Sequence, residues 1–171
     1  MKEGPKPNIS RAKLDNDSSH FKDIMSYLTL DGEPTVGKSA DGNYMLTTKW
    51  NSSYLLDSKT KTPGTIEMSY LIEDTGAVTV RMKLDFTKTK VKKFIKVGTR
   101  LSLAKGTENV SWYGNGDDES YCDRQTYTRV GAYTSTVNKM FYPFAKPQDC
   151  GNLTGAVSYT HLRAHETELH L

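Results

Sequence analysis

The amino-acid sequence predicts an all-β fold, and a β-sandwich is favoured. Apolar and polar residues alternate with a period of two on both sides of a short turn between Ile66 and Phe86, which is the pattern of a hairpin with one buried face. Thr occurs 20 times and Tyr 10 times, and both residue types favour strands. Because no stretch alternates strands with long helices, a parallel α/β sheet is disfavoured.

Length, charge and composition argue against several classes of protein. The 171 residues correspond to about one domain, and a net charge of +3 is too small to indicate nucleic-acid binding without a basic patch. No stretch approaches the roughly 18 apolar residues of a membrane span, and the first residues do not form a signal peptide. Two cysteines, Cys122 and Cys150, are too few for a disulfide scaffold. We therefore expect a soluble, cytoplasmic protein with reduced thiols.

Three elements are expected before the hairpin. Residues Met1 to Ser19 are polar and contain Pro5 and Pro7, so a loop is predicted there. From His20 to Leu30 apolar residues recur at helical spacing, which predicts one short amphipathic helix. Asn43 to Trp50 alternates as a strand does.

The hairpin and the strands after it complete the expected fold. Its first strand begins at Ile66, a turn follows at Glu73 to Gly76, and its second strand ends at Phe86. Three further strands are predicted, over Phe94 to Leu103, Asn109 to Tyr113 and Gly131 to Val137.

The last part of the chain differs from the rest. Residues 157–167 read VSYTHLRAHET, which resembles the conceptual translation of a transposase sequencing adapter. We therefore expect residues 1–156 to be native and 157–171 to be an adapter-derived tail, excluded from fold reasoning. An adapter reached in frame also predicts that the chain is a fragment of a longer gene. The alternative is a metal-binding tail formed by His161, His165 and His170.

An acidic run, Asp117 to Glu119 with Asp123, is the main candidate for glycosidase chemistry. A glycosidase needs two carboxylates about 5 to 10 Å apart, but acidic clusters in a sequence are usually turns or arginine partners. We expect Arg124 to pair with Glu119 or Asp123.

A second oxygen-rich run, Asp15 to Asp17, fits either a hard-cation site or an Asx turn, and the turn is favoured. Arg11 is expected to pair with Asp15 or Asp17. A hydrolytic triad is excluded because His20 is the one histidine outside the tail.

Three other features are interpreted as structural. The run Gly114 to Gly116 lacks the Lys and Ser/Thr of a phosphate loop. Trp112 is expected to be buried, although an exposed aromatic platform formed with Tyr113 is the alternative. The most basic stretch, Lys88 to Lys96, is interpreted as a solvated connection that guards a strand edge rather than a phosphate-binding strip.

Four short runs together resemble one family. PNISRAKLDND at residues 7–17 resembles a PNFWRAPTDND signature, and WYGNGDDESYCDR at 112–124 is similar to WxGxGPxExYPDR. GAY at 131–133 and YPFAKPQDCGN at 142–152 resemble GxY and PYxxPQENGN. In this order and at these spacings, the runs resemble the C-terminal, small-chain domain of the β-galactosidases of glycoside hydrolase family 2. The resemblance covers nearly all of residues 5–155.

Several positions depart from the family pattern and indicate a divergent member. In the first run Ile9 and Ser10 replace Phe and Trp, and Lys13 and Leu14 replace Pro and Thr. The departures in the later runs are Asp117 and Asp118 in place of a Gly/Pro region, Cys122 in place of Pro, and Cys150 in place of Asn.

The resemblance implies a large antiparallel β-sandwich, a supersandwich of the galactose-mutarotase-like type that is incomplete in this chain. It also implies a catalytic TIM barrel, in the same chain or in another subunit, that carries the catalytic glutamates and the main metal ligands. This chain is then expected to hold no catalytic residue, no metal and no cofactor, whereas the parent enzyme would use magnesium and sodium. Expected partners are the barrel and, in the full enzyme, a galactoside; the parent is expected to be a homo-oligomer, and neither nucleic acid nor a membrane is expected.

The resemblance also marks a set of loop positions that share its motifs. They are Arg11, Asp15, Asn16, Asp17, Trp112, Gly114, Gly116, Glu119, Tyr121, Asp123, Arg124, Pro147, Gln148 and Gly151.

The leading hypothesis is therefore a piece of a β-galactosidase that supports hydrolysis of terminal β-D-galactosides such as lactose, without activity of its own. The alternative is a free-standing carbohydrate-binding module or an aldose-epimerase-like protein of the same fold. An epimerase needs histidines for proton transfer, and the presence of His20 alone outside the tail argues against it.

Overall fold

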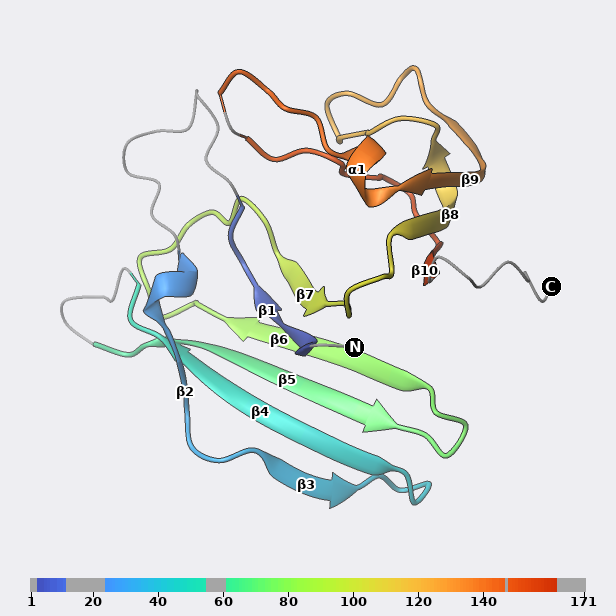
Figure 1. The fold of residues 1–171 in the computed structure, drawn as a ribbon. Helices are drawn as coiled ribbons and strands as arrows, with labels where there is room; N and C mark the ends of the chain where they lie inside the picture. The colour runs from blue at the N-terminus through green and yellow to red at the C-terminus, as the bar shows by residue number, and fades with distance from the viewer. Residues whose placement is uncertain (1–2, 12–23, 55–60, 147, 163–171) are drawn as a thin grey trace. The chain divides into compact units, whose positions relative to one another are not determined.

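The computed structural model describes residues 3–11, 24–54, 61–146 and 148–162 (Figure 1). In this part of the chain ten strands form three sheets, and every strand pair is antiparallel. The described residues up to Ser102 belong to one compact unit, and those from Leu103 onward belong to a second. The predicted all-β, antiparallel fold is confirmed.

The larger sheet of the first unit is built on the predicted hairpin. Strands β5 (Gly64–Ile72) and β6 (Val78–Asp85) pair so that Ile72 lies opposite Val78. The turn between them is closed by the Glu73 amide, which donates to the Ala77 carbonyl at 2.9 Å. Along β5 buried and exposed residues alternate at the start of the strand, so the hairpin and its buried face are confirmed.

Strand β4 (Tyr44–Ser52) pairs with the other edge of β5, which confirms the strand predicted at this position. The outer edge of β4 is shared by β2 (Leu28–Leu30) near its end and β3 (Thr35–Lys38) near its start. All four residues of β3 are exposed, so the strand has no alternation of burial by which the sequence could predict it.

The helix predicted from His20 to Leu30 is wrong over the described residues. Ile24–Tyr27 forms a single 3-10 turn, η1, and the chain then enters strand β2. The reason is tertiary, because the backbone of β2 pairs with Trp50–Ser52 of β4 and cannot continue a helix. Residues 20–23 lie outside the described part.

The loop predicted over Met1 to Ser19 is wrong at Glu3–Asn8, which forms strand β1 and pairs with β7 (Gly98–Ser102). The pairing shifts register between Glu3 and Lys6, and Pro5 lies within this irregularity. Proline has no N–H to donate to a strand ladder, so within sheets it is found at bulges and in edge strands, where that hydrogen bond is not needed. Strand β7 is also shorter than the strand predicted over Phe94 to Leu103.

The core of the first unit lies between its two sheets. β1 and β7 lie over the face of the larger sheet (Figure 1), and the Tyr70 hydroxyl on β5 donates to the Pro5 carbonyl at 2.6 Å. The buried apolar side chains of this core are Ile9, Ile24, Tyr54, Ile66, Met68 and Phe86. The two layers form an antiparallel sandwich, which agrees with the predicted all-β sandwich class.

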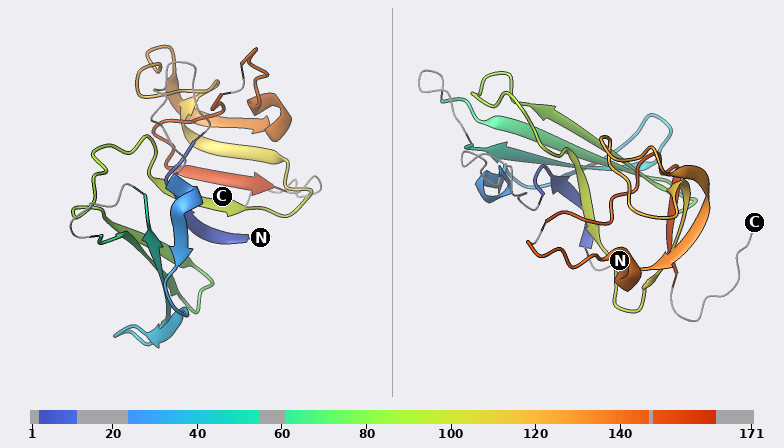
Figure 2. Two further views of the ribbon diagram at one scale, coloured as in Figure 1. Left: turned by 90° about the vertical axis from the view of Figure 1, so that its left-hand side faces the viewer. Right: turned by 90° about the horizontal axis from the view of Figure 1, so that it is seen from above.

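The second unit contains a three-stranded sheet. Strand β8 (Asn109–Gly116) lies between β9 (Arg129–Thr136) and β10 (Ser158–Leu162), as the left view of Figure 2 shows. β8 and β9 confirm the strands predicted at Asn109 and Gly131, although Val137 already begins the short helix α1 (Val137–Met140).

The tail expected to derive from an adapter includes β10, which pairs with β8 along Asn109–Tyr113. The origin of residues 157–171 stays a prediction, because strand pairing shows the conformation of a segment and not where its sequence comes from.

Within the described ranges, no helix has both the length and the apolar character needed to cross a membrane.

Candidate functional site

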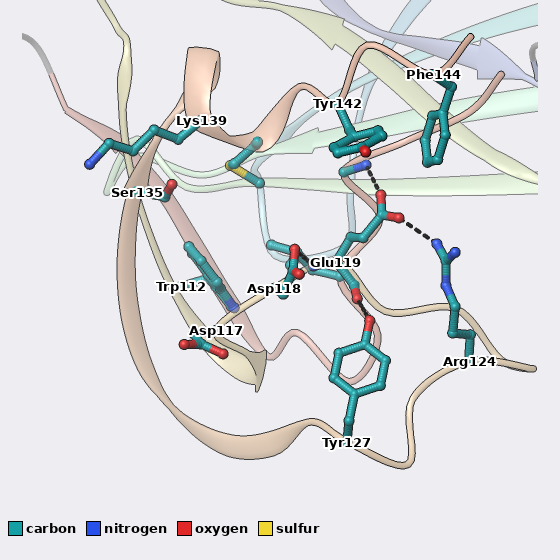
Figure 3. A pocket seen from close by; sticks show the side chains of 13 residues that line it. Trp112, Asp117, Asp118, Glu119, Arg124, Tyr127, Ser135, Lys139, Tyr142 and Phe144 are labelled. Atoms are coloured by element: carbon teal, nitrogen blue, oxygen red, sulfur yellow. Dashed lines mark hydrogen bonds and ion pairs between the residues drawn. The ribbon is translucent and has the colours of Figure 1, made fainter. Parts of the chain in front are cut away.

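Residues of two sequence motifs, at 112–124 and 142–152, line a cavity of about 320 Å³ in the second unit. One wall is the loop that follows β8, and another is the segment from α1 to the approach to β10 (Figure 3). The lining includes both aromatic and charged side chains. They are Trp112, Asp117, Asp118, Glu119, Arg124, Tyr127, Ser135, Lys139, Met140, Tyr142, Phe144, Gly151 and Leu153.

Trp112 forms the base of this site. Its side chain is 4% exposed, its indole N–H donates to the Asn115 carbonyl at 3.1 Å, and its ring centroid lies 5.5 Å from that of Tyr133. The predicted burial of Trp112 is confirmed, and the alternative of an exposed platform is wrong. Tyr113, which points to the opposite face of β8, is 49% exposed.

Gly114 and Gly116 are required by close packing. A Cβ on Gly114 would lie 2.7 Å from the Cα of Ala156, and one on Gly116 would lie 2.5 Å from the ring of Tyr133. Both distances are shorter than real Cβ contacts, so only glycine fits. Gly114 and Gly116 of the Gly-Asn-Gly run therefore serve packing.

Glu119 joins three parts of the site. Its carboxylate pairs with the guanidinium of Arg124 and accepts a hydrogen bond from the Gly151 amide at 2.8 Å. Its backbone carbonyl accepts from the Tyr127 hydroxyl. The predicted pairing of Arg124 with Glu119 is confirmed, and these contacts give the motif glutamate a positioning role (Figure 3).

A polar network behind Glu119 was not predicted. Ser120, which is fully buried, donates its amide to the Asn152 carbonyl at 2.6 Å, and its hydroxyl lies 2.8 Å from that of Thr154. The Thr154 hydroxyl also accepts from the side chain of Asn115 and donates to that of Gln125. These bonds use the full capacity of the Thr154 hydroxyl.

The network holds two loops together that are 34 residues apart in the sequence. Sequence reasoning missed Ser120 and Thr154 because single hydroxyl residues have no characteristic spacing. Asn152, the last residue of the PQDCGN run, was the one member of this network that a sequence motif marked.

Tyr121 lies beside the network. Its ring centroid is 5.2 Å from the Arg124 guanidinium carbon, and its hydroxyl is buried with no hydrogen-bond partner among the residues that the structure describes. Burial, assisted by the nearby carboxylates of Asp149 and Glu119, raises the pKa of Tyr121 to about 12.

The remaining predicted positions contribute differently. Asp123 is exposed in the tight turn between Tyr121 and Arg124, and Gln148 is half-buried. Cys122 is exposed and Cys150 is partly buried, and both are free thiols. Asp15, Asn16, Asp17 and Pro147 lie outside the described residues, so the predicted pairing of Arg11 and the Asx turn stay predictions.

Two further kinds of site were considered in the sequence, a metal site and a basic phosphate-binding strip. Within the described ranges, no three His, Cys, Asp or Glu side chains cluster as metal ligands would. The lysines between Lys88 and Lys96 lie in the irregular connection between β6 and β7, and their side chains are exposed.

Comparison with known proteins identifies the family. A family model described as "Beta galactosidase small chain" matches residues 1–168. The β-galactosidase of Streptococcus thermophilus is 28% identical over 171 aligned residues, covering 94% of this chain and 16% of the relative. That of Priestia megaterium is 25% identical over 87 residues, covering 51% and 8%, and that of Vibrio cholerae is 39% identical over 56 residues, covering 33% and 6%.

The chain thus spans less than one fifth of the length of each of these relatives. With nearly its whole length matched by one family model, the chain belongs to the β-galactosidase small-chain family.

Proposed function

We propose that this chain supports the hydrolysis of terminal β-D-galactosides, lactose included, as one part of a β-galactosidase and without catalytic activity of its own. In this proposal the partner is a catalytic TIM barrel, and the assembled enzyme is a cytoplasmic homo-oligomer. Magnesium and sodium bind mainly outside this chain, and the galactoside is the substrate of the full enzyme.

The observation that carries the proposal is the extent of the family match. It covers residues 1–168 of this chain, whereas the same chain aligns with only 16% of the Streptococcus thermophilus β-galactosidase. A segment that corresponds to so small a share of an enzyme is expected to work together with the remaining part.

The chemistry of the cavity supports a role without catalysis. A glycosidase needs one carboxyl group that protonates the leaving oxygen and a second that acts as nucleophile or base. Glu119 is unsuited to either task, because Arg124 and the Gly151 amide occupy its two oxygens. The aspartates beside it, Asp117 and Asp118, follow one another in the chain.

A chimaera tests the proposal. In the Streptococcus thermophilus β-galactosidase, the segment aligned with this chain would be replaced by residues 1–171. We expect the chimaera to hydrolyse a chromogenic galactoside, and both the isolated chain and the enzyme without the segment to be inactive. Turnover by the isolated chain, or a folded chimaera without activity, would contradict the proposal.

The second candidate function, a carbohydrate-binding module, is favoured by the aromatic side chains that line the cavity, among them Tyr142 at 61% exposed. A module of this kind would bind galactose without any need for a barrel. An aldose epimerase is less well supported, because His161 is the only histidine of the described residues and its Nδ1 lies 3.1 Å from the Thr107 carbonyl.

A further inference from the structure

We propose that the cavity of the second unit binds a neutral saccharide, held between the aromatic rings of Tyr142 and Phe144 and the carboxylates of Asp117 and Asp118. The choice of galactosides as the first sugars to test rests on the proposed function. The site itself is inferred from the shape and lining of the cavity.

The aromatic part of the site is a corner formed by two rings. The centroids of Tyr142 and Phe144 lie 4.6 Å apart with the ring planes at 58°, and Tyr142 is 61% exposed. Leaving a large aromatic side chain in water at the rim of a cavity forgoes the gain from burying it. A sugar ring has a C–H face that can cover such a ring.

The polar part of the site supplies both acceptors and donors of hydrogen bonds. The Asp117 carboxylate has no hydrogen-bond partner within the described ranges, and Asp118 uses one oxygen to accept from the Glu119 amide at 2.7 Å. Ionised carboxylates only accept, whereas Ser135 and the further N–H groups of Arg124 can donate. Sugar hydroxyls do both, so a polyol matches this mixed lining.

Charge and size favour the same class of ligand. Glu119 is neutralised by Arg124, and Lys139 is among the residues that line the same cavity. A strongly charged ligand of either sign would therefore meet like charge in the wall. About 320 Å³ lies at the lower end of the volumes of small-molecule sites, which suits one or two sugar rings.

The site is preorganised, and two of its acceptors depart from the family motif. The bonds of Glu119 to Arg124 and Gly151 fix the loop that carries the aspartates, which lowers the ordering cost of binding. Asp117 and Asp118 themselves stand where the family motif has a Gly/Pro region, so these acceptors come from the divergence of this chain. Figure 3 shows the aspartates on one side of Glu119 and the aromatic pair on the other.

Titration of the full chain with methyl β-D-galactoside and lactose, followed by calorimetry and by NMR, tests the inference. We expect saturable binding with a dissociation constant in the millimolar range. Tyr142→Ala and Asp117→Asn are each expected to weaken it about tenfold, the loss expected for removal of one ring contact or one charge-assisted hydrogen bond. The matched control is Tyr113→Ala, which removes an exposed tyrosine from outside the cavity and should leave binding unchanged.

Three outcomes would overturn the inference. They are the absence of saturable binding by any of a panel of neutral saccharides, binding that both cavity variants leave unchanged, and tighter binding of tetramethylammonium than of the sugars. The outcome is separable from that of the chimaera. An active chimaera with no sugar binding by the chain rejects this site alone, whereas sugar binding with an inactive, folded chimaera rejects the proposed function alone.

Discussion

The ring of Tyr133 occupies the space in which a side chain on Gly116 would lie. A Cβ built on Gly116 would come within 2.5 Å of the Tyr133 Cδ2, and the same ring stacks at 5.5 Å on Trp112. The hydroxyl of Tyr133 donates to the Arg129 carbonyl at 2.8 Å, so the ring is held at both ends and cannot turn aside cheaply. The glycine and the aromatic pair are therefore one packing unit.

Gly116→Ala is expected to destabilise the second unit by about 1–3 kcal/mol, because an added methyl group overpacks the site. The midpoint of urea unfolding measures the effect. Gly37→Ala is the matched control, since a Cβ there meets nothing within 4 Å, and its midpoint should hardly move. Combining Gly116→Ala with Tyr133→Leu should recover part of the loss, and additive losses would refute the packing explanation.

Thr154→Val is expected to cost about 1–3 kcal/mol, because the donors of Asn115 and buried Ser120 lose their acceptor. Thermal unfolding gives the size of the loss. Thr134→Val, at an exposed position of β9, is the control and should be neutral. Equal effects of the two variants would show that the network contributes nothing to stability.

Glu119→Ala is expected to cost about 2–3 kcal/mol, because the Gly151 amide and the Arg124 guanidinium both lose their partner. Glu119→Gln keeps an acceptor for the amide and should cost about 1 kcal/mol or less, since Arg124 is half exposed and its ion pair is screened.

The control for the charge at Glu119 is Glu67→Gln. The Glu67 carboxylate lies 4.0 Å from Lys49 with both side chains exposed, so the unfolding free energy should change by less than about 0.5 kcal/mol. A larger loss for Glu67→Gln than for Glu119→Gln would contradict the assignment of Glu119 as a positioning residue.

Tyr121 is expected to make the protein less stable in alkali. Its pKa is raised from 10.0 to about 12 in the fold, so the folded state favours the neutral hydroxyl. This contribution is fully present below pH 10 and is lost as the pH rises from about 10 to about 12. Because the phenylalanine variant has no proton to lose, the unfolding midpoint of wild type should fall below that of Tyr121→Phe across this range, and the two midpoints should diverge.

At neutral pH Tyr121→Phe is expected to be neutral or slightly stabilising, since the buried hydroxyl has no partner among the described residues. A marked loss of stability at pH 7 would mean that the hydroxyl does make a bond in solution. Tyr113→Phe, at an exposed position, provides the pH control.

Met68→Ala is expected to destabilise the first unit by about 2–5 kcal/mol, because Met68 is fully buried between the two sheets. Met45→Ala, at a residue 38% exposed on the neighbouring strand β4, is the matched control and should cost much less. Circular dichroism during thermal unfolding compares them, and equal losses would contradict the assignment of the core.

The success of prediction depended on how local the determining interaction is. The hairpin of β5 and β6 was predictable because its alternation and its turn lie within one continuous segment. The helix expected from His20 to Leu30 is wrong over its described part because Leu28–Leu30 pairs with Trp50–Ser52, and helical spacing gives no sign of that pairing. The loop expected at Glu3–Asn8 failed for the same reason, since β7 lies about ninety residues away in the sequence.

The sequence by itself determined the all-β class, the family, the burial of Trp112 and the pairing of Arg124 with Glu119, because each depends on residue periodicity or on short sequence motifs. Only the tertiary structure decided that Gly116 makes room for Tyr133, that Thr154 completes the bonds of Ser120, and that Tyr142 and Asp117 line one cavity. Those relationships join side chains from separate segments, and their energies come from contact and desolvation, which exist only once the chain has folded.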